Sequence, residues 1–292
     1  MITRRSFIIN TSMATTAVLA LPSLAFTMNN KEIGLQLYTL RNEISKDVKT
    51  TLEKVAVAGF TTVETYGFSI KEQFWGLSAI ELKKVLDANN LKAVSGHYNL
   101  GSFLYDGNTA ELIAAIEAAK VLKSEFLTIP WIDEPFRKNI EDYKKIASRL
   151  NEAAKMCQKA GLKIAYHNHD FEFQKHGGIT GYEILLQETD KDLVFFELDL
   201  YWVVRSGNDP IKLFKANQDR FKMWHVKDMD KINPALNTEI GSGSIDFKTI
   251  FKETKQSGMK HFFVEQENNY GGNSFKSIQT SFDFISKNLI LK

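Results

Sequence analysis

The chain has 292 residues, enough for two small domains or for one α/β barrel, which typically takes about 250 residues. Its 37 basic and 35 acidic residues leave a formal net charge of +2, which does not indicate the basic surface of a nucleic-acid-binding protein. The single cysteine, Cys157, excludes an intramolecular disulfide and a thiolate metal cluster.

Residues 1–25 are predicted to be a targeting segment rather than part of the fold. Paired arginines lie within Thr3–Ile8, an apolar stretch covers Ala14–Leu21, and Ser23–Ala25 is a small-x-small cleavage signal. The paired arginines resemble the twin-arginine export signal, which predicts a periplasmic bacterial protein. A general secretory signal and an uncleaved anchor are the alternatives. The apolar stretch is shorter than the roughly 20 residues of a membrane-spanning helix, so we expect no stable membrane anchor after cleavage.

Apolar segments typical of strands alternate with helical patterns along the rest of the chain. Eight segments are expected to be strands: Ile33–Tyr38, Thr61–Glu64, Leu91–Ser95, Phe126–Ile129, Leu162–His167, Leu193–Asp199, Phe221–Val226 and His261–Glu265. The expected helices are Val48–Ala58, Ser78–Asn89, Thr109–Leu122, Ile140–Ala160, Gly181–Thr189, Pro210–Ala216, Phe247–Ser257 and Ser274–Lys287. This alternation indicates parallel βαβ units, and eight of them predict an α/β fold, a (β/α)₈ TIM barrel that forms a single domain over residues 28–292.

An open, doubly wound sheet is the alternative architecture. It would need a glycine-rich phosphate-binding turn after the first strand, and Tyr38–Arg41 contains no glycine. No linker or low-complexity tract divides the chain, so the sequence favours one barrel.

Polar residues gather where the apolar strands end, although charged side chains are almost never fully buried without partners. In a TIM barrel the functional groups lie at these carboxyl ends. Four residues that directly follow apolar runs are therefore predicted to hold one divalent ion: His167, Asp199, His225 and Glu265. Two imidazoles and two carboxylates suit Mn²⁺, Zn²⁺, Co²⁺ or Fe²⁺ better than Ca²⁺. The absence of thiolates and the room for substrate oxygens indicate a catalytic site.

Three strand ends resemble a known family. Phe196–Trp202, Trp224–Asp228 and Phe263–Glu267 are similar to the corresponding segments of the xylose-isomerase-like sugar phosphate isomerase/epimerase barrels. The resemblance extends over nearly all of residues 31–290. It implies the same barrel fold and a carbohydrate substrate.

The resemblance also implies a ligand set. In the ketose 3-epimerase branch, one divalent metal is held by Glu, Asp, His and Glu from the last four strands. Asp199, His225 and Glu265 match this set, whereas His167 stands where that branch has its first glutamate. That glutamate also acts as an acid and base, so His167, His169 or Glu172 would have to take this role here.

These residue types predict a metal-dependent sugar isomerase or epimerase. The metal would bind a carbonyl oxygen and the neighbouring hydroxyl and would stabilise an enediolate, while a carboxylate or imidazole removes the adjacent proton. Loss of a leaving group after the same first step would give a lyase or hydrolase of keto-glycosides, an alternative that export to the periplasm favours. Two less favoured alternatives are an abasic-site endonuclease of the same superfamily and a non-catalytic sugar-binding barrel.

Further roles are assigned to residues at the strand ends. The predicted catalytic residues are Glu265, His167, Glu172 and Lys227, and the predicted substrate-binding residues are Glu64, His97, His169, Trp131 and Trp202. Structural alternatives exist for several: Glu64 could pair with a cation, His97 could be a structural histidine, and Lys227 could pair with Asp228. Glu267 competes with Glu265 as a ligand, because alternate residues of a strand face the same side. The expected partner is a small carbohydrate, without nucleic acid, and a homo-oligomer is compatible with the sequence.

Overall fold

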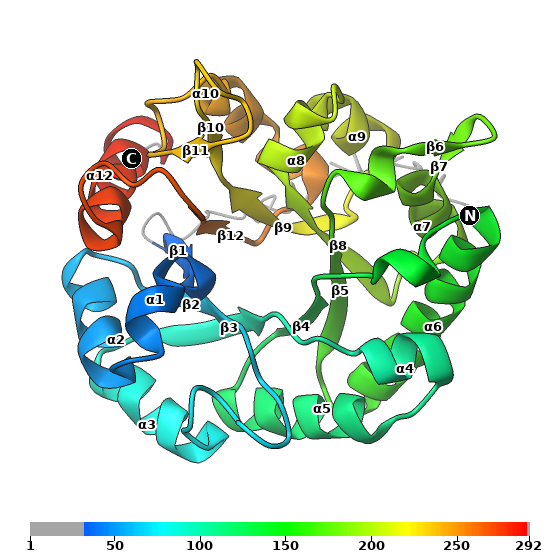
Figure 1. The fold of residues 1–292 in the computed structure, drawn as a ribbon, viewed down its shortest axis with the longest axis horizontal. Helices are drawn as coiled ribbons and strands as arrows, with labels where there is room; N and C mark the ends of the chain where they lie inside the picture. The colour runs from blue at the N-terminus through cyan, green and yellow to red at the C-terminus, as the bar shows by residue number, and fades with distance from the viewer. Residues whose placement is uncertain (1–31, 291–292) are drawn as a thin grey trace, which may run out of the picture.

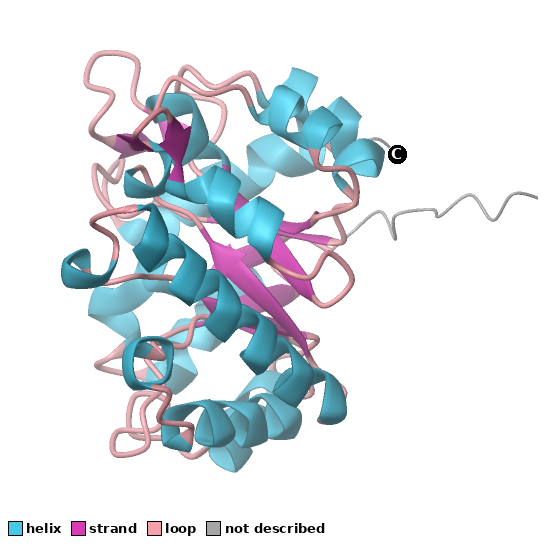
Figure 2. Cartoon of the chain, turned by 90° about the vertical axis from the view of Figure 1, so that its right-hand side faces the viewer, coloured by secondary structure: helices cyan, strands magenta, loops and turns pink. Residues whose placement is uncertain are grey.

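The computed structural model describes residues 32–290, so the predicted targeting segment 1–25 lies outside the described residues. Eight parallel strands form one sheet in the order β3-β2-β1-β12-β9-β8-β5-β4. Helices surround this sheet on its outer side, as the views along and across the barrel show (Figures 1 and 2). The strands are β1 (Gly34–Gln36), β2 (Thr62–Thr65), β3 (Lys92–Gly96), β4 (Phe126–Ile129), β5 (Lys163–His167), β8 (Val194–Asp199), β9 (Phe221–Val226) and β12 (His261–Val264).

The two outermost strands of this order, β3 and β4, meet and complete the ring. An isolated parallel bridge joins His97 to Thr128, and the backbone N–H of Tyr98 donates to the carbonyl of Thr128 at 2.9 Å. The hydroxyls of Ser95 and Thr128 also lie 2.9 Å apart. The predicted (β/α)₈ TIM barrel is therefore confirmed.

The helices around the barrel follow the predicted pattern of apolar residues. The long helices are α2 (Val48–Val57), α3 (Ala79–Ala88), α5 (Ala110–Leu122), α6 (Ile140–Lys159), α7 (Gly181–Glu188), α9 (Pro210–Ala216) and α12 (Ser274–Asn288). In α6 the buried residues Tyr143, Ile146, Ala147 and Leu150 recur at helical spacing, so they form one stripe that faces the core. Asn139 begins this helix by accepting a hydrogen bond from the backbone N–H of Asp142.

Two predicted elements differ from the structure. The first strand was expected to reach Tyr38 but ends at Gln36, because the Gln36 side chain accepts the backbone N–H of Tyr38 at 3.0 Å and starts a helical turn. The helix expected over residues 247–257 is divided into α10 (Phe247–Ile250), a 3₁₀ turn η4 (Phe251–Glu253) and α11 (Thr254–Ser257).

Several short elements were not predicted, and most follow the carboxyl ends of the strands. They are η1 (Leu37–Leu40), α1 (Arg41–Ile44), α4 (Gly101–Asp106), η2 (Glu134–Phe136), η3 (Phe171–Phe173), α8 (Leu200–Arg205) and two small antiparallel pairs, β6 (Lys175–His176) with β7 (Ile179–Thr180) and β10 (Asp228–Met229) with β11 (Asn237–Thr238). They build the rim of the functional end. Within residues 32–290, no helix combines the length and the apolar character that crossing a membrane requires.

A small apolar cluster fills the interior of the barrel below this end. It consists of Phe126, Ala165, Met223 and Phe263, which come from β4, β5, β9 and β12 and are fully buried. Since β4 and β12 lie four places apart in the ring of eight, these side chains meet across its axis. The cluster therefore closes the barrel beneath the polar groups described next.

Candidate metal centre

The four predicted ligands lie close together at the carboxyl ends of their strands. His167 ends β5, Asp199 ends β8, and Glu265 directly follows β12. The Nδ1 atom of His225 lies 2.9 Å from Oε2 of Glu265, and Nε2 of His167 lies 3.9 Å from Oδ2 of Asp199. Asp199, His225 and Glu265 offer ligand atoms that are all within 4.8 Å of one another. Their common role as metal ligands stays a prediction.

The register of the strands explains this convergence. Asp199 is the partner of His225 between β8 and β9, and His225 is in turn the partner of Phe263 in β12. Side chains alternate along a strand, so Glu265 faces the same side as Phe263, into the barrel. By the same rule β8 directs two carboxylates inward, Asp199 and Glu197.

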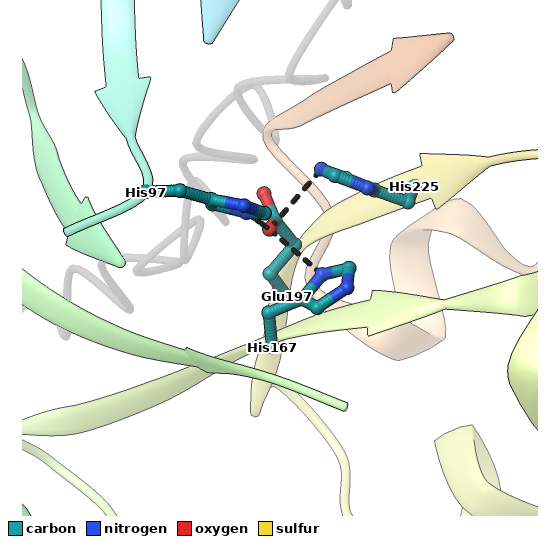
Figure 3. Close-up of side chains that lie close together, drawn as sticks. All are labelled: His97, His167, Glu197 and His225. Atoms are coloured by element: carbon teal, nitrogen blue, oxygen red, sulfur yellow. Dashed lines mark hydrogen bonds and ion pairs between the residues drawn. The ribbon is translucent and has the colours of Figure 1, made fainter. Parts of the chain in front are cut away.

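Glu197 is a site residue that the sequence interpretation missed. Its Oε2 atom lies 2.7 Å from Nε2 of His97, 3.0 Å from Nδ1 of His167 and 3.2 Å from Nε2 of His225. Figure 3 shows the three imidazoles directed at this carboxylate from different strands. These four residues form a second group whose candidate ligand atoms lie within 4.8 Å of one another. The signal in the sequence was the acidic residue two positions before Asp199 in an otherwise apolar strand.

Glu64 lies beneath the site and is fully buried. Its Oε2 lies 2.6 Å from Nε2 of His225 and accepts from the amide of Gln36 at 2.6 Å, while its Oε1 accepts from the hydroxyl of Ser95 at 2.6 Å. Its oxygens are thus occupied by protein groups. Glu64 was predicted to bind substrate, but it contacts His225 instead of lining the cavity.

Lys227 places a cation among three carboxylates. Its Nζ lies 2.8 Å from Oε2 of Glu265, 3.2 Å from Oδ2 of Asp199 and 2.5 Å from Oε1 of Glu267. Burial opposes the charged form, but these carboxylates outweigh burial and hold the pKa of Lys227 well above its ordinary value. Asp228, the alternative partner, instead accepts backbone N–H groups of the following loop.

Burial and the neighbouring charges act in opposite directions on the histidines. Burial, together with the imidazoles of His225 and His97, lowers the pKa of His167 well below its ordinary value. Burial also opposes protonation of His97, but the carboxylates of Glu64 and Glu197 raise its pKa to about 9. The His167 ring is therefore neutral and keeps a lone pair, as a metal ligand must.

A cavity of about 480 Å³ opens above these groups. It is lined by Tyr38, Tyr66, Gly67, His97, Asn99, Pro130, Trp131, His167, His169, Asp170, Trp202, Lys227, Glu265 and Glu267. The His169 ring lies edge-on to Trp131, with centroids 4.9 Å apart, and 5.6 Å from Trp202. Its Nδ1 is buried and has no hydrogen-bond partner among the described residues. Burial, reinforced by Lys227, lowers the pKa of His169 to about 3, so this imidazole is neutral.

Glu172, predicted to be catalytic, lies behind the cavity wall. Its carboxylate accepts from the hydroxyl of Tyr166 at 2.5 Å and from the backbone N–H of His169 at 2.9 Å. Burial raises its pKa to about 7. The structure thus connects Glu172 to the segment that carries His169, and its own acid/base role stays a prediction.

Comparison with known proteins agrees with this fold. The sequence model of the family described as xylose isomerase-like TIM barrel matches residues 52–288. An inosose dehydratase of Clostridium botulinum is 28% identical over 226 residues, which is 65% of this chain and 70% of that protein. An inosose dehydratase of Clostridium beijerinckii shows the same identity and the same coverage.

Solved structures show the same architecture. Two sugar phosphate isomerase/epimerases of Parabacteroides distasonis superpose with TM-scores of 0.80 and 0.79, at 26% and 29% identity. The matches cover 94% and 90% of this chain and 99% and 100% of those chains. The IOLI protein, solved with a bound zinc atom, is 17% identical with a TM-score of 0.70 over 89% of this chain and 100% of that chain, a likeness of fold alone.

Proposed function

The chain belongs to the xylose isomerase-like TIM-barrel family, and from this premise we propose that it is a metal-dependent enzyme that removes the proton beside the carbonyl of a carbohydrate. The observation that carries this proposal is the convergence of ligand atoms of Asp199, His225 and Glu265 within 4.8 Å of one another, beside a cavity that Glu265 lines. Relatives named as isomerase/epimerases and as inosose dehydratases support a carbohydrate substrate.

The residues present fit a divalent ion. The Oδ2 atom of Asp199 is buried and accepts no hydrogen bond from residues 32–290, although the Lys227 ammonium is 3.2 Å away. His167 adds a ring nitrogen 3.9 Å from that oxygen. Imidazole and carboxylate donors suit Mn²⁺, Zn²⁺, Co²⁺ or Fe²⁺. An ion bound here would polarise the substrate carbonyl and stabilise negative charge on its oxygen.

Other side chains at the cavity would stabilise charge, accept the proton and contact the sugar. The ammonium of Lys227 offsets negative charge that develops on the substrate. The neutral ring of His169, with its unpartnered Nδ1, accepts the proton from carbon. Trp131 and Trp202 offer apolar faces for the C–H groups of a sugar ring. Glu172 holds the backbone of His169 in place through the hydrogen bond described above.

The fate of the deprotonated substrate defines two candidate reactions. Loss of a leaving group from the next carbon is favoured by the relatives named inosose dehydratases, which match over 226 residues of alignment. Return of the proton elsewhere, which gives isomerisation or epimerisation, is favoured by the Parabacteroides proteins at 26% and 29% identity. We propose elimination as the first candidate and isomerisation or epimerisation as the second.

Proton exchange with solvent tests the step that both reactions share. The purified protein, loaded in turn with Mn²⁺, Zn²⁺, Co²⁺ and Fe²⁺, is incubated in D₂O with ketoses, an inosose and 3-keto-glycosides. For at least one of these substrate classes, we expect ¹H NMR to show deuterium on the carbon beside the carbonyl. The Asp199→Asn variant should introduce no deuterium. Aglycone release or enone absorbance would identify elimination, and a new stereoisomer would identify epimerisation. Metal binding without exchange in any class would contradict the proposal.

Export to the periplasm is a separate proposal, supported by the paired arginines within Thr3–Ile8. Replacing both arginines by lysine should retain the protein in the cytoplasm of the producing bacterium, and cell fractionation measures this. Unchanged export after that replacement would contradict the twin-arginine route.

A further inference from the structure

We propose that Glu197 is a positioning residue that fixes which nitrogen of His167 faces the metal ion, and that Glu64 does the same for His225. This inference rests on the proposed metal centre and concerns two residues that do not line the cavity. Both carboxylates are fully buried at the carboxyl ends of β8 and β2.

The geometry around His167 assigns its two ring nitrogens. Nδ1 lies 3.0 Å from Oε2 of Glu197, and Nε2 lies 3.9 Å from Oδ2 of Asp199. A neutral imidazole has one N–H and one lone pair, and an ionised carboxylate only accepts hydrogen bonds. Nδ1 therefore carries the hydrogen toward Glu197. The lone pair remains on Nε2, the nitrogen that faces Asp199.

His225 faces a carboxylate through each of its ring nitrogens, so its assignment rests on the proposed metal centre. Its Nε2 lies 2.6 Å from Oε2 of Glu64, and its Nδ1 lies 2.9 Å from Oε2 of Glu265. The same Glu64 oxygen also accepts a hydrogen bond from the Gln36 amide. An ion held by Asp199 and Glu265 would take the lone pair of Nδ1, the nitrogen beside Glu265, and would leave Nε2–H to donate to Glu64. Two carboxylates below the site thus direct one nitrogen of each histidine toward the same space.

Glu197 makes few interactions, apart from those with the imidazoles, that would explain its burial. Within residues 32–290 no lysine or arginine forms an ion pair with it, and its Oε1 accepts no hydrogen bond. An ionised carboxylate in such a place is costly unless its partners compensate for the lost water. Its partners are imidazoles, and carboxylates that orient metal-binding imidazoles are a recurrent arrangement. Because Glu197 lies two residues before Asp199, one strand supplies both a ligand and the group that orients its neighbour.

Measurement of metal affinity tests the positioning role of Glu197 independently of enzyme activity. In Glu197→Gln the side chain keeps its shape but loses its charge, and titration calorimetry with Zn²⁺ or Mn²⁺ should show one bound ion with about 10- to 100-fold weaker affinity. Glu197→Asp should recover part of the loss. The matched control is Glu125→Gln, which also removes a carboxylate facing a histidine, His261 at 3.1 Å, but at the opposite end of the barrel. Its metal affinity should equal that of the unaltered protein.

A second measurement uses the unaltered chain and does not depend on a variant that folds. The chain has only 6 histidines, so ring ¹⁵N labelling can identify the tautomer of each one. In the zinc-loaded protein we expect His167 to carry hydrogen on Nδ1 and metal on Nε2, and His225 to bind metal through Nδ1. Metal on Nδ1 of His167 would overturn the inference, because Glu197 would then be a ligand together with His97.

The possible failures can be told apart. Unchanged affinity in Glu197→Gln, next to an unaltered protein that binds one ion, would overturn only the role of Glu197. An unaltered protein that binds no divalent ion would overturn the metal centre and this inference with it.

Discussion

The ammonium of Lys227 and the carboxylate of Glu265 form a buried ion pair, with Nζ 2.8 Å from Oε2. This oxygen is the one that also faces Nδ1 of His225 at 2.9 Å. The lysine thus neutralises a carboxylate that the proposed ion would share. The ammonium of Lys227 and a metal ion bound nearby would repel each other, and the first prediction below begins from this competition.

Replacement of Lys227 by methionine should make folding more dependent on metal. The metal-free variant loses the counter-charge of a buried cluster and should be about 3 kcal/mol less stable. Added Zn²⁺ or Mn²⁺ should stabilise it more than it stabilises the unaltered protein, because the repulsion by the ammonium is gone. Urea unfolding with and without metal measures both quantities. Lys222→Met, which breaks a pair with the exposed Asp219, is the control and should gain no extra response to metal.

Removal of metal should lower the thermal stability, and Asp199→Asn should abolish this effect. A ligand at 100 times its Kd stabilises the native state by about 2.7 kcal/mol. Asparagine can still accept the backbone N–H of Trp202, which Asp199 does at 3.0 Å, so the start of α8 is preserved. Calorimetric melting with chelator and with added metal gives the result. Asp47→Asn changes another N-cap and should leave the metal response intact, and a full response in Asp199→Asn would contradict its role as a ligand.

Protonation of Glu125, at the amino end of the barrel, should lower the stability of the protein at acidic pH. The hydrogen bond from His261 lowers the pKa of Glu125 well below its ordinary value of 4.5, and Lys163 adds to this. A depressed pKa contributes stability above the unfolded value, and this contribution is lost as pH falls below about 4.5 through the folded value. The loss should be on the order of 1 kcal/mol, because solvent screens this partly exposed group.

The measurement is urea unfolding of the unaltered protein and Glu125→Gln between pH 6 and pH 3. The difference in unfolding free energy between them should be largest near pH 6 and should shrink toward pH 3. Glu117→Gln, which removes an exposed pair with Lys120, should show almost no pH-dependent difference. A difference for Glu125→Gln that does not change with pH would contradict the prediction.

Truncation of Trp131 to alanine should weaken substrate binding more than turnover. Trp131 lines the cavity but is 41% exposed, so its loss should leave the fold intact. We expect KM for the exchanging substrate to rise about tenfold, from about 1.4 kcal/mol of lost contact, with kcat changed less than threefold. Phe136→Ala removes an aromatic ring of similar exposure, 40%, outside that cavity and should leave KM unchanged. A fall in kcat with unchanged KM would point to a role in the chemical step instead.

The sequence was sufficient for the fold because each strand is an apolar run followed by a helix with its own end signals. Phe126–Ile129 and Phe221–Val226 are strands with the predicted bounds. The prediction failed where a side chain overrides the pattern, as the Gln36 amide does when it begins a turn inside an expected strand. Short elements such as α8 were missed because a six-residue helix shows too little periodicity to be recognised.

The site was predictable only in part, for a physical reason. Residues that directly follow an apolar run, such as His225 and Glu265, can be identified from that position alone. Glu197 lies inside its strand, where the neighbouring phenylalanine and leucine make it resemble an isolated substitution in the core. Its contacts with His97 and His167 join strands far apart in the sequence, and no local pattern contains that information.

No continuous ladder joins β3 to β4: an isolated bridge links His97 to Thr128, and backbone hydrogen bonds run from Tyr98 to Thr128 and from Glu125 to Val94. This boundary is where the barrel should open first in local fluctuations, and the amide of Tyr98 should lose protection before amides within β8 and β9. An opening at this boundary would part the barrel wall beside His97. The strands that carry Asp199 and His225 need not move.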